Sequence, residues 1–71
     1  MNNMKIEIND TQPLDEVVST LESKGYVKSE TFTGVDSVII TAFSNGEFTD
    51  WTQNTLKGMY ETTLAELKEM K

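Results

Sequence analysis

The stretch MKIEINDTQPLDEVVSTLESKG, residues 4–25, changes from the periodicity of a β-strand to that of an α-helix across a single turn. Its first five residues alternate between apolar and charged side chains, which is typical of a half-buried strand. Apolar side chains then recur at the spacing of one helix face, at Leu14, Val17, Val18 and Leu21. Asn9 to Pro13 has turn chemistry, and Lys24 followed by Gly25 is a typical helix end. The stretch therefore predicts a strand over 4–8 and a helix over 14–24.

The middle of the chain has the composition of β-structure. Tyr26 to Thr33 and Val38 to Phe43 are rich in aromatic, β-branched and threonine side chains, and Gly34-Val35 between them predicts a tight turn. We therefore predict a β-hairpin, whose register depends on the length of that turn. Ser44-Asn45-Gly46 predicts a further turn, and Glu47 to Thr49 is then either a short returning strand or a loop.

The last third of the chain predicts one long helix that is capped by Thr49 or Asp50 and runs to Met70. The residues that share its main face, most of them apolar, are Leu56, Met59, Tyr60, Thr63, Leu64, Leu67 and Met70. Core packing is the ordinary role of such a face, and a groove-docking or oligomer face is the alternative. About twenty residues make a helix of roughly 30 Å, longer than a strand of about 20 Å. Leu67 and Met70 would then overhang the sheet and need a partner.

The order strand, helix, strand, strand, helix predicts a single α+β domain over residues 1–71. We expect two layers, with both helices on one face of a three-stranded sheet. The connection through the first helix is long enough for a parallel crossover, so the first two strands should be parallel neighbours or lie one position apart.

The residue inventory argues against catalysis. The chain has no histidine, cysteine or arginine, and histidine is the usual base that activates a nucleophile. Without histidine and cysteine there is no disulfide and no zinc site of the common kinds. The four glycines are scattered rather than grouped in a phosphate-binding loop. We therefore predict that the protein is not an enzyme and has no catalytic residue, cofactor or metal.

The charge of the chain limits its partners. Twelve acidic residues against six lysines give a net charge of −6, which repels phosphate backbones and anionic membranes. We expect no direct binding to nucleic acid and no membrane association. The first twenty residues contain no signal-peptide core, which predicts a cytoplasmic protein. Frequent lysine, asparagine and threonine without arginine indicate an AT-rich genome, such as that of a low-GC bacterium or its phage.

Two surfaces are candidates for binding another protein, each with core packing as the alternative. Trp51, Gly58 and Ala65 recur at seven-residue intervals on the reverse side of the predicted final helix, where a glycine permits close approach. The predicted hairpin carries aromatic and β-branched side chains on both faces, and two helices on one face would leave the other uncovered. Together with the helix end, the candidate residues are Tyr26, Phe32, Ile39, Phe43, Trp51, Gly58, Ala65, Leu67 and Met70.

The sequence thus favours a small acidic adaptor or inhibitor, bacterial or phage-encoded, that binds a protein through a sheet face or the final helix. The alternative from another class is a structural homo-oligomer. A second alternative is a DNA mimic that inhibits a nucleic-acid-binding protein. The mixed signs of Lys57, Glu61, Glu66 and Lys68 are more typical of a solvated helix face than of a mimic.

Overall fold

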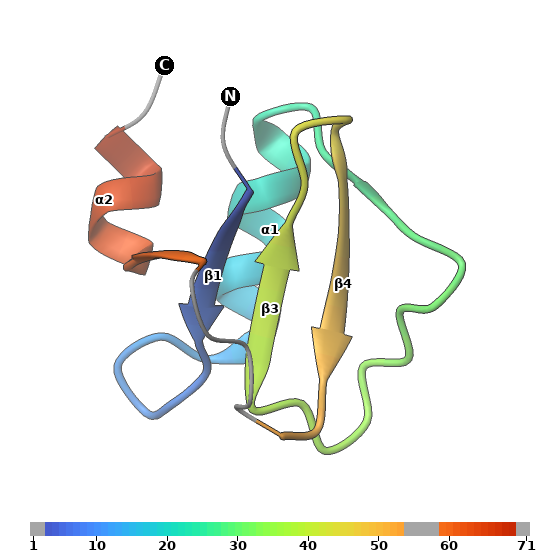
Figure 1. The fold of residues 1–71 in the computed structure, drawn as a ribbon. Helices are drawn as coiled ribbons and strands as arrows, with labels where there is room; N and C mark the ends of the chain where they lie inside the picture. Colours follow the sequence, from blue (N-terminus) through green and yellow to red (C-terminus); the bar gives the residue numbers. More distant parts are fainter. Residues whose placement is uncertain (1–2, 54–58, 70–71) are drawn as a thin grey trace.

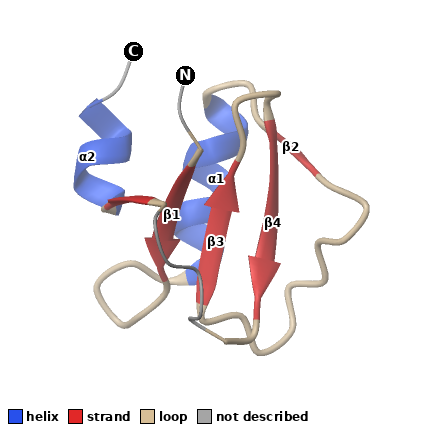
Figure 2. Ribbon diagram, viewed as in Figure 1, coloured by secondary structure: helices blue, strands red, loops and turns tan. Residues whose placement is uncertain are grey.

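The computed structural model describes residues 3–53 and 59–69, which form an α+β domain with two helices. Figure 1 follows the chain through its elements, and Figure 2 separates helices from strands. In chain order the elements are β1 (Met4–Glu7), α1 (Leu14–Ser23), β2 (Val27–Lys28), β3 (Ile39–Ala42), β4 (Glu47–Trp51), β5 (Tyr60–Thr62) and α2 (Leu64–Glu69).

The five strands form one mixed sheet in the order β2-β4-β3-β1-β5. β3 lies antiparallel to both of its neighbours, whereas β1 pairs with β5 and β2 pairs with β4 in parallel. The prediction of a three-stranded sheet in the order β-α-β-β-α is therefore wrong. The prediction that the first two strands are neighbours or lie one position apart is also wrong, because both β4 and β3 lie between β1 and β2.

The first third of the chain has the predicted structure. β1 alternates between buried and more exposed side chains, and α1 buries Val17 and Leu21. The Asn9 side-chain oxygen accepts hydrogen bonds from the backbone N–H groups of Thr11 (3.0 Å) and Gln12 (3.1 Å). These bonds stabilise the turn between β1 and α1. After α1, Gly25 has a φ of 94°, the left-handed backbone expected of a glycine at a helix end.

The hairpin of the sheet is formed by β3 and β4, not by the segments on either side of Gly34-Val35 as predicted. Its closing pair is Phe43 and Glu47, where the Phe43 N–H donates to the Glu47 carbonyl (2.8 Å). Gly46 in the connection has a φ of 92°, which suits the left-handed position of a three-residue hairpin loop. The returning strand that was one of two alternatives for Glu47 to Thr49 is thus confirmed and extends to Trp51.

The prediction of one long final helix is wrong. Residues 47–51 and 60–62 are strands, and α2 covers only Leu64–Glu69. The reason is tertiary pairing. β4 satisfies its backbone hydrogen bonds on β3, and Tyr60–Thr62 satisfies its own on the edge of β1. Because β-branched and aromatic residues fit a pleated surface well, the helical spacing of apolar positions in this segment was outweighed.

Both helices bury their apolar residues in one core on the same side of the sheet. This core contains Val17 and Leu21 of α1, Leu64 and Leu67 of α2, and side chains of the strands. The strand residues in this core include Met4, Ile6, Ile40, Ala42 and Phe48. α1 lies behind the strands in the view of Figure 1, and α2 lies beside β1. Figure 1 therefore shows the sheet from the side that α1 does not cover.

Candidate functional site

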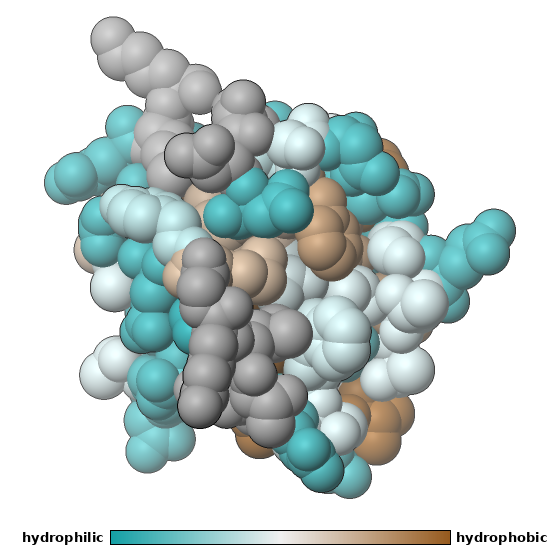
Figure 3. All heavy atoms as spheres, in the orientation of Figure 1, coloured by the Kyte–Doolittle hydropathy of each residue, from teal (hydrophilic) through white to brown (hydrophobic). Residues whose placement is uncertain are grey.

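The sheet surface opposite α1, which we call the outer face, is defined by the strand register. Residues directly opposite one another in paired strands point to the same side. Three cross-strand rows follow from the pairing along the strands and from the backbone hydrogen bond between Phe43 and Glu47: Glu7–Ile39–Trp51; Glu61–Lys5–Thr41–Thr49; and Phe43–Glu47–Val27. Viewed in space-filling form, this side shows pale and brown residues toward its middle and hydrophilic residues mainly at its periphery (Figure 3).

Trp51 is the largest side chain of the outer face, and 42% of its surface is exposed. Its indole Nε1–H donates a hydrogen bond to Thr41 Oγ1 (3.0 Å) on the neighbouring strand. Next to this pair, Thr49 Oγ1 and Thr31 Oγ1 are hydrogen-bonded at 2.7 Å. One edge of the indole is therefore anchored to the sheet, and a part of its surface remains available to a binding partner. Such a held aromatic loses little conformational entropy when it binds.

The other hairpin residues singled out in the sequence lie in different environments. Tyr26 is buried in the core, and Phe32 packs against that core with its ring edge-on to Phe48, at a centroid distance of 5.5 Å. Ile39 belongs to the outer face but is buried, whereas Phe43 is half-buried. Of this group the structure therefore brings Ile39, Phe43 and Trp51 to one surface and places the other two on the core side.

The candidates on the predicted final helix do not form one surface. Trp51 lies in β4 and Ala65 in α2, so the predicted helical stripe of small and apolar residues is wrong; Gly58 and Met70 lie outside the described residues. Leu67 is fully buried in the core by contacts within the chain. The expected overhang of Leu67 is therefore wrong, because α2 is short and packs against α1.

A groove of about 510 Å³ lies between the two helices and includes Ala65 in its lining. Its polar side chains are already paired. The Gln12 side-chain oxygen accepts from the Leu64 N–H (3.1 Å), while its amide donates to the Glu7 carbonyl. Lys68 Nζ forms an ion pair with Glu16 Oε1 (2.9 Å). These contacts join α2 to α1 and to the turn before it, which favours a structural role for the groove.

Asp50 organises the long connection between β2 and β3. The prediction that it caps a helix is wrong, because it lies in β4 and accepts hydrogen bonds from the connection. Its carboxylate receives the N–H groups of Thr33 (2.9 Å) and Gly34 (2.7 Å) and the hydroxyl groups of Thr33 and Ser37. Partial burial by itself raises the pKa of Asp50, but the hydrogen bonds from Ser37, Thr33 and Gly34 outweigh it, so the pKa is lower than the ordinary value.

Sequence reasoning missed three acidic side chains of the outer face: Glu7, Glu47 and Glu61. The alternation in β1 already put Lys5 and Glu7 on its polar side, but nothing in the sequence showed which strands would flank it. Among residues 3–53 and 59–69, no group of three or more acidic side chains is close enough to hold a metal ion. No helix within these ranges is long and apolar enough to cross a membrane.

Comparisons of this chain with protein-family models, with curated proteins and with solved structures find no match.

Proposed function

We propose that this chain is a small non-catalytic protein-binding module, an adaptor or inhibitor, which binds another protein through the outer face around Trp51. The observation that carries the proposal is the combination of exposure and immobility at Trp51. The indole is 42% exposed and is held by its hydrogen bond to Thr41. Tryptophan is strongly enriched among the residues that dominate binding energy in protein interfaces.

The geometry favours the outer face over the C-terminal helix as the binding surface. α2 has only six residues, and its two large apolar side chains, Leu64 and Leu67, are buried in the core. An amphipathic helix that docks into a partner's groove must present such side chains outward. On the outer face, by contrast, Trp51, Phe43 and Val27 all retain exposed surface. The cytoplasmic location expected from the sequence is part of this proposal.

The experiment that tests the proposal compares two exposed aromatic residues on opposite sides of the sheet. Trp51 lies on the outer face, whereas Tyr60 is 55% exposed and lies on the side of Met4, its partner in the pairing of β5 with β1. Three tagged proteins are used to capture partners from the cytoplasm of the cell that makes the chain: the wild type, the Trp51→Ser variant and the Tyr60→Ser variant. Circular dichroism first establishes that both variants are folded.

We expect the Trp51→Ser variant to bind the captured partner at least about tenfold more weakly than the wild type does. This loss corresponds to about 1.4 kcal/mol or more of binding free energy, as expected for an interface anchor. The Tyr60→Ser variant should capture the partner as the wild type does. Equal capture by all three chains would contradict the outer face as the binding surface. Loss of capture with Tyr60→Ser alone would place the interface on the opposite side of the sheet.

A further inference from the structure

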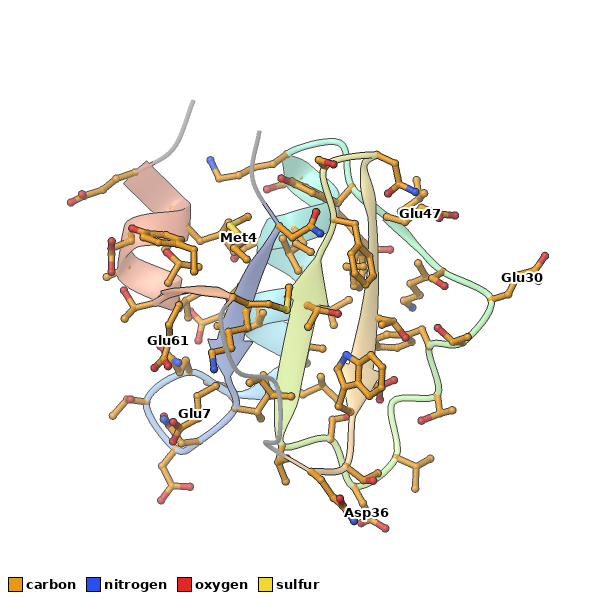
Figure 4. The ribbon with its side chains drawn as sticks, viewed as in Figure 1. Met4, Glu7, Glu30, Asp36, Glu47 and Glu61 are labelled. Atoms are coloured by element: carbon orange, nitrogen blue, oxygen red, sulfur yellow. The ribbon has the colours of Figure 1, made fainter. Side chains whose placement is uncertain are left out.

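Each of the three rows of the outer face contains a carboxylate. Glu7 lies in the same cross-strand row as Trp51, with Ile39 between them. Glu61 and Glu47 belong to the two other rows. Figure 4 shows these three side chains at different positions around the strands. The first and third rows therefore each hold an aromatic side chain, Trp51 or Phe43, together with a carboxylate. We call the carboxylates of the three rows the acidic margin of the outer face.

Two further carboxylates extend this acidic margin. Figure 4 shows Glu30 at the outer bend of the connection between β2 and β3 and Asp36 at the end of the sheet where β4 stops. Both side chains are exposed. Around the sheet, the acidic groups thus occupy the periphery from the edge next to β5 to the edge next to β2.

Positive charge on the outer face is sparse within the described part of the chain. There, the strand register assigns one lysine to this face, Lys5, which pairs with Thr41. Lys28 pairs with Phe48 and its ammonium lies 5.3 Å from the Phe32 ring, on the core side of the sheet. The ion pair of Glu16 with Lys68 joins the two helices. Counted over the described residues, the three rows of the outer face therefore hold more carboxylates than lysines.

We infer that the partner of the outer face is a basic protein surface, in which an apolar side chain contacts Trp51 and lysine or arginine side chains lie opposite the acidic margin. This inference rests on the proposed function. Opposite charges at an interface margin increase the association rate and exclude partners of the wrong sign. A second copy of this chain on the same face would bring two surfaces that each carry Glu7, Glu47 and Glu61 together, and the like charges of the two surfaces disfavour that contact.

Three short peptides serve as probes. The first has leucines flanked by lysines, the second replaces the lysines with glutamates, and the third replaces the leucines with serines. Binding is followed by ¹⁵N NMR through the indole N–H of Trp51, the only tryptophan of the chain. We expect the lysine–leucine peptide to shift this signal and the glutamate peptide to leave it unchanged. The lysine–serine peptide should bind more weakly than the first, because it lacks the apolar contact.

Charge variants test the acidic margin directly. We expect Glu7→Gln combined with Glu61→Gln to weaken binding of the lysine–leucine peptide about fivefold at about 10 mM salt, where the Debye length is roughly 30 Å. The difference should vanish near 1 M salt, where that length is roughly 3 Å. The matched control is Asp15→Asn combined with Glu22→Gln, which removes two exposed charges from α1 behind the sheet.

Two results would overturn the inference: equal shifts with the glutamate peptide, or an equal loss of affinity in the α1 control. Its failure is distinguishable from failure of the proposed function. If the captured partner depends on Trp51 but is insensitive to salt and to Glu7 and Glu61, the basic partner is refuted and the binding surface stands. If capture does not depend on Trp51, the proposed function itself fails.

Discussion

Replacing Asp50 with asparagine should destabilise the domain strongly, because one carboxylate holds the connection between β2 and β3 against β4. Four donors from Thr33, Gly34 and Ser37 converge on its two oxygens. The single amide oxygen of asparagine can accept at most two of these bonds, and its NH₂ group then faces the remaining donors.

The size of this effect follows from the bonds that are lost. A hydrogen bond to a charged acceptor contributes about 1.5–3 kcal/mol, and the partial exposure of Asp50 reduces that figure. Losing two bonds should therefore cost about 2 kcal/mol, against a total stability of about 3–5 kcal/mol for a core of this size. With a urea dependence of about 1 kcal/mol/M, the unfolding midpoint should fall by about 2 M.

Urea titration followed by Trp51 fluorescence measures this shift. The matched control is Asp36→Asn in the same connection. Asp36 is exposed and has a φ of 53°, a backbone that asparagine tolerates well, so its midpoint should stay within about 0.5 M of the wild type. An unchanged midpoint in Asp50→Asn at pH 7 would refute the reasoning.

The pH dependence gives an independent check. The folded-state pKa of Asp50 lies below its ordinary value of 3.8, so the folded chain favours the ionised carboxylate. The resulting stabilisation is fully present above the pKa of the unfolded chain and is lost as the pH falls through the lowered folded pKa. Wild type and Asp50→Asn should therefore differ most near neutral pH and converge in acid. A difference that grows in acid would contradict the role assigned to the carboxylate.

Two further substitutions test the core and the hairpin. Thr62 is buried, and its hydroxyl has no hydrogen-bond partner among the described residues; Thr62→Val should therefore raise the free energy of unfolding by about 1 kcal/mol, measured by urea titration. A decrease would mean that the hydroxyl is satisfied after all. Gly46→Ala should cost about 1 kcal/mol and lower the melting temperature by about 4–8 °C. Beyond the two chain neighbours of Gly46, no atom lies within 4 Å of the added methyl group. The strain therefore comes from the φ of 92°, and Gly46→Asn should lose less.

The candidate site was only partly predictable. Trp51 and Phe43 could be proposed as binding residues from their chemistry alone. Their placement on one face with Glu7, Glu47 and Glu61 could not, because it depends on which strands are neighbours. For Leu67 the prediction of a binding residue was wrong. The sequence indicated a helix end that overhangs the sheet, whereas the structure places Leu67 in the core.

The sequence by itself determined the local structure of the first third of the chain. β1, the Asn9 turn, α1 and the glycine at its end depend on contacts within a few residues, so periodicity and turn chemistry identify them. Only the tertiary structure decided the second half. Tyr60–Thr62 becomes a strand because the edge of β1 offers it hydrogen-bond partners more than fifty residues away. The periodicity of neighbouring residues contains no information about such distant partners. A helix was therefore predicted for this segment, although it forms an edge strand of the sheet.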